Sequence, residues 1–451
     1  MIGFETIGSA TIIVHDDVPV LTTDAWINRD AYFGSWCHDY EIPSLQLDSI
    51  KRAKFHWFSH GHPDHLNVDS LPDLTGGQFL LSDHFGGRIN RDLKAAGYNV
   101  CVLPDRKWIR LSKNVAVWSY TNKNQDSILL ININGRFVID ANDSPDFGSA
   151  WHIKRLVRGA ARTYLCQLHG WGGADMLNLF DPSGRPLTEP NALRRTIAPR
   201  AQRSAIQHGA THFIPFSSFH RYQRTDSAWA NELIPDLGDY QSGAMKNAPE
   251  VLPPFIRVDC VNDRIEEIKP RRTEIQLRKP EDFGDSWSDS LEKDDFSLID
   301  DYFKSRVHLS EHFGFIEVKS GGVVRTVRIN RSLGDVGVSF EVPRSSLIAS
   351  LKYEVFDDLL IGNYMKTTLH NVKGLYPEFS PFVAKYADNG GAKTESELGV
   401  YFHHYRMRDP IGMLMTKFAT SSEQMFRKFV TEDSFLFSAV KKAYYSLKSG
   451  S

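Results

Sequence analysis

The stretch Ser59-His60-Gly61-His62-Pro63-Asp64-His65-Leu66 places three imidazoles and one carboxylate within six residues. It follows directly on the apolar run Phe55-His56-Trp57-Phe58, which predicts a buried strand. A tight loop at a strand end can direct several side chains at one point, and imidazole and carboxylate are ligands of zinc, iron and manganese. We therefore predict that His60 and His62 hold one divalent ion, and that Asp64 and His65 are catalytic residues that hold a second.

This spacing resembles the His-x-His-x-Asp-His motif of the metallo-β-lactamase superfamily. The resemblance implies an α/β fold, the αββα sandwich of that superfamily, with two ions ~3.5–4 Å apart that activate a bridging water. The neighbouring pattern agrees with an α/β fold, because β-rich runs alternate with helical ones. Strands are expected at residues 10–14, 18–23, 79–81, 100–103, 115–119 and 211–215, a hairpin at 127–139, and helices at 88–96 and 193–207.

The resemblance also implies ligands from later segments. Asp143 follows the strand Phe137-Val138-Ile139 and is the expected bridging carboxylate, with Asp140 as its rival. His220 follows the strand at residues 211–215, where the superfamily often places its last histidine. The histidine that the superfamily places before the hairpin is missing. Either Asp126 or Asn122 replaces it, or His169 reaches in from a later loop.

Length and composition indicate a globular protein of more than one domain. The 451 residues are 41% hydrophobic and 24% charged, with a formal net charge of −2. We expect a metallo-β-lactamase-like catalytic domain at 1–260, a charge-rich linker or excursion at 261–300, and a smaller C-terminal α+β domain at 301–451. In the last of these, a hairpin is expected around Gly321-Gly322 and helices at 345–350 and 356–360.

The charge balance and the hydropathy exclude several classes of partner. A near-neutral chain has no bulk attraction for nucleic acid or for an acidic membrane. No apolar run is long enough for a membrane span, and the N-terminal residues lack the pattern of a signal peptide, so we expect a cytoplasmic location. The four cysteines, Cys37, Cys101, Cys166 and Cys260, form no Cys-x-x-Cys pair and are expected to be free.

A closer resemblance is to the metallo-β-lactamase-like part of the CMP-N-acetylneuraminate hydroxylase family. It rests on Ser59 to Leu66 and on six weaker stretches: Gln125 to Ile128, Gly135 to Ile139, Asn142-Asp143, His169 to Ala174, Phe213 to Phe216 and Asp357 to Gly362. That family oxidises an N-acetyl group of a nucleotide sugar and carries a Rieske domain that delivers electrons. This chain has no second Cys-His pair for a Rieske centre. The resemblance therefore implies an external ferredoxin or Rieske protein as partner.

Two functions follow from these observations. The first is hydrolysis of a phosphoester, lactone or amide of a small anionic substrate through metal-bound hydroxide. The alternative is a non-haem iron, or di-iron, oxygenase that acts on a nucleotide sugar or another anion. In either case Arg221 and Arg224, which follow His220 closely, are expected to bind the anionic group of the substrate.

Overall fold

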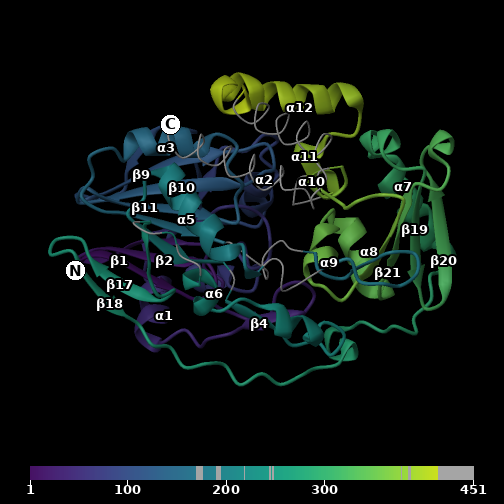
Figure 1. The fold of residues 1–451 in the computed structure, drawn as a ribbon, viewed down its shortest axis with the longest axis horizontal. Helices are drawn as coiled ribbons and strands as arrows, with labels where there is room; N and C mark the ends of the chain where they lie inside the picture. Colours follow the sequence, from purple (N-terminus) through teal and green to yellow (C-terminus); the bar gives the residue numbers. More distant parts are fainter. Residues whose placement is uncertain are drawn as a thin grey trace.

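Two β-sheets packed face to face form the larger part of the protein (Figure 1). The computed structural model describes residues 1–168, 176–188, 194–217, 219–242, 245, 248–376, 378–383 and 388–414. The first sheet has the order β18 (Arg264–Glu267), β17 (Ile256–Asp259), β1 (Ile2–Ile7), β2 (Thr11–Asp16), β3 (Val18–Thr23), β5 (Phe55–Phe58), β6 (Gln78–Ser82) and β7 (Val100–Leu103). The second has the order β16 (Glu250–Val251), β14 (His212–Pro215), β12 (Thr163–Gln167), β11 (Arg136–Asn142), β10 (Ser127–Ile133), β9 (Val115–Thr121) and β8 (Trp108–Arg110).

Apolar side chains alternate between the two faces of each strand and thereby form three apolar layers. On β10, Leu129 and Ile131 face the first sheet, whereas Ile128 and Leu130 face the helices on the outside. On β2, Ile12 faces the second sheet and Ile13 faces outward. Successive side chains of a strand point to opposite faces, so a sheet that is covered on both sides reads as a continuous apolar run. These apolar runs explain why the strands could be predicted from the sequence.

Helices cover both outer faces of the sandwich. They are α1 (Ser44–Lys51), η1 (Leu71–Leu74) and α2 (Arg88–Ala95) on the first sheet, and α3 (Ser149–Leu156), α5 (Ile197–His208) and α6 (Leu237–Gln241) on the second. The larger part of the chain is therefore the predicted αββα sandwich, and this prediction is confirmed. A short η2 (Ala228–Leu233) and a two-stranded sheet of β4 (Trp36–His38) and β15 (His220–Tyr222) lie among its loops.

A third sheet forms the core of the smaller C-terminal unit, on the right in Figure 1. Its order is β13 (Leu179–Phe180), β22 (Lys366–His370), β21 (Gly337–Glu341), β19 (Phe315–Ser320) and β20 (Val323–Arg328). Because β13 comes from the sandwich half of the sequence, the two units share this sheet. The helical elements are η4 (Val307–Glu311), η5 (Arg331–Leu333), α7 (Lys293–Lys304), α8 (Arg344–Tyr353), α9 (Asp357–Ile361), α10 (Ser380–Val383) and α11 (Asp388–Gly391).

The charge-rich stretch at 261–300 contains regular structure. It supplies the edge strand β18, the short helix η3 (Pro280–Phe283) and the start of α7. Edge strands are commonly rich in charge, because charged side chains discourage pairing with another chain. This accounts for the low apolar content from Arg264 to Glu267.

The helix α12 (Glu395–Arg408) leads from the C-terminal unit back to the sandwich, along the top of Figure 1. Its Arg408 pairs with Asp83 at 2.9 Å, and the Tyr405 hydroxyl accepts a hydrogen bond from the backbone of Phe85. Among the described helices, none combines the length and the hydropathy that crossing a lipid bilayer requires.

The core of the C-terminal unit depends on α9, and a cavity there is expected to destabilise the protein. Leu359 is fully buried against Phe356 and its neighbours, so Leu359→Ala should lower the free energy of unfolding by ~2–5 kcal/mol. Urea denaturation monitored by fluorescence measures this change. The control Leu45→Ala removes a side chain that is 58% exposed and should cost less than ~0.5 kcal/mol. Equal effects of the two variants would contradict this packing.

Candidate metal centre

The histidine-rich loop leaves the end of β5, in the middle of the first sheet. The backbone N–H groups of His65 and Leu66 both donate to the carbonyl of His62, at 3.0 and 2.8 Å, which closes a tight turn. This turn brings together the side chains of His60, His62, Asp64 and His65, and each of them is at most 3% exposed. Buried imidazoles and carboxylates require partners, so the contacts of each side chain can be followed one by one.

The contacts of His60 assign its proton to Nδ1. The Ser59 hydroxyl donates to Asp24 Oδ2 at 2.7 Å, so its oxygen is left to accept a hydrogen bond from His60 Nδ1 at 2.9 Å. Asp126 Oδ1, 3.8 Å from the same nitrogen, favours a proton there as well. The other nitrogen, Nε2, therefore carries a lone pair.

The contact of His62 Nε2 with the carboxylate oxygen Oδ2 of Asp357 at 2.7 Å assigns the proton of His62 to Nε2, because an ionised carboxylate only accepts. His62 Nδ1 then carries a lone pair, and it lies 2.7 Å from His60 Nε2. Two lone pairs at this distance repel each other unless a proton bridges the two nitrogens or a cation lies beside both. A divalent ion bound by both nitrogens would displace such a proton, so the pair suits two ligands of one ion.

In His65, too, one ring nitrogen is hydrogen-bonded to an oxygen and the other faces the site. Its Nδ1 donates to Asp24 Oδ2 at 2.9 Å, and its Nε2 lies 3.4 Å from Asp64 Oδ2. The other oxygen of Asp64 accepts a hydrogen bond from the Tyr32 hydroxyl at 2.5 Å. Histidines that bind metals almost always donate their second N–H to a carboxylate or another oxygen, and all three imidazoles of the motif do so here.

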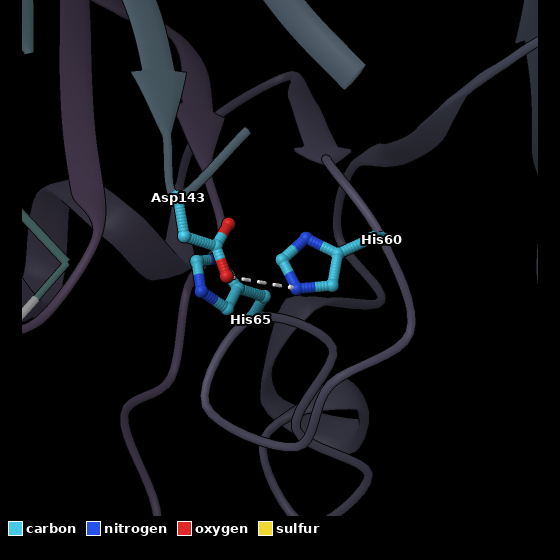
Figure 2. A group of neighbouring side chains, drawn as sticks. All are labelled: His60, His65 and Asp143. Carbon is cyan, nitrogen blue, oxygen red and sulfur yellow. Dashed lines mark ion pairs between the residues drawn. The ribbon is translucent and has the colours of Figure 1, made fainter. Parts of the chain in front are cut away.

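Asp143 lies between the pair His60 and His62 and the pair Asp64 and His65. Its Oδ2 is 3.6 Å from His60 Nε2, and one ligand atom each from His60, His65 and Asp143 lies within 4.8 Å of the others (Figure 2). Asn142, just before it, ends β11 with a positive φ of 47°, and a register shift against β12 accompanies this turn. The backbone thereby directs Asp143 to the site.

The rival carboxylate, Asp140, lies deeper between the sheets and in neither of the two candidate groups found among the described residues. Burial and the charge of Asp24 raise the pKa of Asp140 well above its usual range. This shift disfavours the ionised carboxylate, which is the form that binds a metal ion.

The carboxylates around His65 require positive charge. Burial alone would lower the pKa of His65, but the charges of Asp64 and Asp24, and more weakly that of Asp143, raise it to about 10. A divalent ion bound at Nε2 would satisfy the same carboxylates and would displace this proton. Both the hydrogen bonds and the charges of the site thus fit a cation.

The structure places one of the three candidates for the missing histidine next to the site. Asp126 is buried and lies beside His60, on its Nδ1 side. The Asn122 amide is hydrogen-bonded to Ser144 Oγ and to the backbone of Asn124. His169 lies outside the described residues.

His220 lies in neither candidate metal group found in the described part of the chain. It is on β15, stacked on the Trp36 ring with the two ring centroids 3.3 Å apart and the planes 5° apart. Burial, with a smaller effect of Arg221, lowers the pKa of His220 well below its usual value. Its surroundings are aromatic, but neither of its buried ring nitrogens has a hydrogen-bond partner among the described residues, so its ligand role stays a prediction.

The two arginines predicted to bind substrate are already paired within the protein. Arg224 is fully buried, and its guanidinium donates to Asp226 and Asp285. Arg221 Nε lies 3.3 Å from a carboxylate oxygen of Asp39. Arg224 is buried where the loops pack together, and nothing around it supports the predicted contact with substrate.

Three residues of the site escaped the sequence analysis: Asp24, Tyr32 and Asp357. Asp24 is the first residue after β3, and β3 is the parallel neighbour of β5. Ligands bind at the carboxyl ends of adjacent parallel strands, so the position of Asp24 directly after β3 could have identified it as a candidate site residue. Tyr32 comes from a loop, and Asp357 comes from the C-terminal unit, where it begins one stretch of the hydroxylase resemblance without a predicted role at the site.

No protein family model matches the chain. The cytidine monophosphate-N-acetylneuraminic acid hydroxylase of Asterias rubens is 24% identical over 141 residues, which is 28% of this chain and 20% of that protein. The chain thus matches about a fifth of the length of this curated relative.

Solved structures with related folds include hydrolases and a hydroxylase. Igni18, a metallo hydrolase of Ignicoccus hospitalis, is 16% identical, and the match covers 59% of this chain and 98% of that one, with a TM-score of 0.38. CmlA, a diiron β-hydroxylase from Streptomyces venezuelae, is 15% identical over 59% of this chain and 54% of its own, with a TM-score of 0.36. An isothiocyanate hydrolase from Delia radicum gut bacteria is 8% identical over 59% and 98%, with a TM-score of 0.36.

The αββα sandwich with the His-x-His-x-Asp-His loop at the end of β5 is the metallo-β-lactamase fold, as the sequence predicted. The buried donors are of the types that bind transition metals. The chain therefore has this fold, and its buried donors are suited to divalent metal ions: His60 and His62 would hold one ion, Asp64 and His65 a second, and Asp143 both.

Loss of the Asp24 charge should affect the second ion position. Asp24→Asn removes a negative charge that favours the protonated imidazole of His65, so the pKa of His65 should fall below about 10 in the metal-free protein. The weaker orientation of the ring should also lower metal affinity ~10–100-fold. NMR titration and competition with a chelator measure the two effects. The control Asp17→Asn changes an exposed carboxylate, and a matching loss in this control would contradict the role of Asp24.

Proposed function

We propose that this protein is a non-haem iron oxygenase that hydroxylates a small polar molecule. The observation that carries the proposal is the donor set around His60 Nε2, which consists of His62 Nδ1 at 2.7 Å and Asp143 Oδ2 at 3.6 Å. Two histidines and one carboxylate with open positions are the usual ligands of iron(II) in oxygenases. The neighbouring position adds one imidazole and one carboxylate, from His65 and Asp64.

The low nitrogen content of the site supports iron. Zinc hydrolases often bind their ion through three imidazoles, and the residue that the structure puts beside His60 is a carboxylate, Asp126. Among the described residues, no imidazole outside the motif joins either candidate metal group. Di-iron sites of other folds also combine few histidines with several carboxylates.

The curated relative supports the same reaction class, since its name is that of a hydroxylase. Its substrate, a nucleotide-linked acidic sugar, suggests an anionic sugar derivative for this protein too. Arg224 is buried in ion pairs with Asp226 and Asp285, so its charge is already balanced within the protein.

Hydroxylation requires a source of electrons. One C–H bond, one dioxygen, two electrons and two protons give one alcohol and one water, and bound iron would supply the activation of dioxygen. A separate ferredoxin or Rieske protein is the proposed donor. The chain offers no cysteine pair for an iron–sulfur cluster of its own.

Hydrolysis is the second candidate, and the proximity of the two ion positions favours it. His60, His65 and Asp143 place ligand atoms of both positions within 4.8 Å of one another. Two adjacent ions would lower the pKa of a water to ~7 and supply a nucleophile. A set of two histidines and one carboxylate also occurs in zinc hydrolases.

Metal content and oxygen consumption distinguish the two candidates. Protein purified without chelator, from cells given both iron and zinc, should contain about two iron ions per chain by mass spectrometry of the elements. With a chemical reductant it should consume dioxygen. His62→Ala should remove at least one ion, because it deletes one of the two facing nitrogens.

The matched control is His403→Ala, which removes an exposed imidazole on α12 and should leave the metal content unchanged. Zinc in place of iron, with hydrolysis of phosphoesters or lactones, would replace the oxygenase by the hydrolase. Protein without metal would contradict both candidates.

A further inference from the structure

The short helix α9 belongs to the C-terminal unit but is anchored in both units. Leu359 and Leu360 pack in the core of the C-terminal unit, whereas Ile361 packs in the layer between the second sheet and its helices. In Figure 1, α9 lies on the side of the C-terminal unit that faces the sandwich. The first residue of the helix is thereby held at a fixed place beside the histidine-rich loop.

Hydrogen bonds fix the end of α9 as well. The Ser35 hydroxyl donates to the carbonyl of Gly362 at 2.6 Å, and the fully buried Asn363 donates from its amide to the Tyr222 hydroxyl at 2.9 Å. The Asn363 side-chain oxygen accepts from the backbone of Leu177 at 2.7 Å. Satisfied buried polar contacts of this kind specify one docking arrangement.

The contact between Asp357 and His62 joins the two units at the metal centre. Asp357 is 2% exposed, and its Oδ2 lies 2.7 Å from His62 Nε2 across 295 positions of sequence. Because the carboxylate accepts the Nε2 proton, the lone pair of His62 is on Nδ1, where it faces His60 Nε2. An isolated imidazole would exchange its proton between both nitrogens.

Asp358 lies in the same group, with ligand atoms of His62, Asp357 and Asp358 within 4.8 Å of one another. A separate ion held by these three residues would need an unprotonated His62 Nε2. His62 would then have to bind two cations through one ring, since its Nδ1 already faces His60. A hydrogen bond from Nε2–H to Asp357 satisfies the same contact without this demand.

We infer that the C-terminal unit contributes to the metal centre, and that its Asp357 is a positioning residue that holds His62 in its metal-binding tautomer. This inference rests on the proposed metal-dependent function. It assigns the first ion position to both units: the sandwich supplies the ligands, and α9 supplies the acceptor that orients one of them.

The test compares the two ion positions within one protein, with cobalt(II) as the probe. In Asp357→Ala, one of the two cobalt(II) ions should bind ~10–100-fold more weakly, because His62 loses its acceptor, while the other ion keeps its affinity. Asp357→Asn keeps an acceptor oxygen and should lose less. Competition with a chelator gives both dissociation constants, and the visible absorption of bound cobalt(II) reports a changed ligand environment at one position.

The control Asp335→Asn changes an exposed carboxylate of the same unit and should leave both constants unchanged. Unchanged constants in Asp357→Ala would overturn the inference. Equal weakening of both ions, together with a lower Tm, would mean that Asp357 is only structural, and would overturn it too. If the unmodified protein binds no cobalt(II), the proposed function itself fails, and the inference falls with it.

Discussion

A single buried carboxylate, Asp24, joins the elements that form the metal centre. It accepts hydrogen bonds from the Ser59 backbone, the Ser59 hydroxyl, His65 and Asn142, all within 2.9 Å. These partners lie at or beyond the ends of β5 and β11, one strand from each sheet. The charge of Asp24 is fully buried, so it requires all of these donors. The positions of the histidine loop and of the Asp143 turn follow from this requirement.

The centre extends beyond the sandwich. Asp64 is held by Tyr32 from a loop, and His62 is held by Asp357 from the C-terminal unit. Each imidazole of the motif thus has one nitrogen fixed by an oxygen acceptor and the other turned toward the site. A preorganised set of this kind binds a cation without having to rearrange, which is the advantage of orienting ligands through their neighbours.

Sequence reasoning recovered the elements that local patterns specify. The apolar runs that became β3, β5 and β7, and the hairpin around Gly321 and Gly322, were predicted because alternation and turn residues act over a few positions. The motif also gave the four buried side chains from His60 to His65. It gave no indication of Asp357, because a contact across 295 positions depends on how two units dock. His220 and Arg224 were predicted as site residues from their positions near a strand end, and local sequence did not reveal that they pack among aromatic rings and ion pairs.

We propose that the facing nitrogens of His60 and His62, with Asp143, hold a metal ion. A crystal structure with anomalous diffraction measured at the iron and zinc absorption edges would locate this ion. One anomalous peak is expected in contact with His60 Nε2 and His62 Nδ1, and a second ~3.5–4 Å away beside Asp64 and His65. Electron density that shows a direct hydrogen bond between the two imidazoles, with no anomalous peak after iron or zinc is supplied, would contradict it.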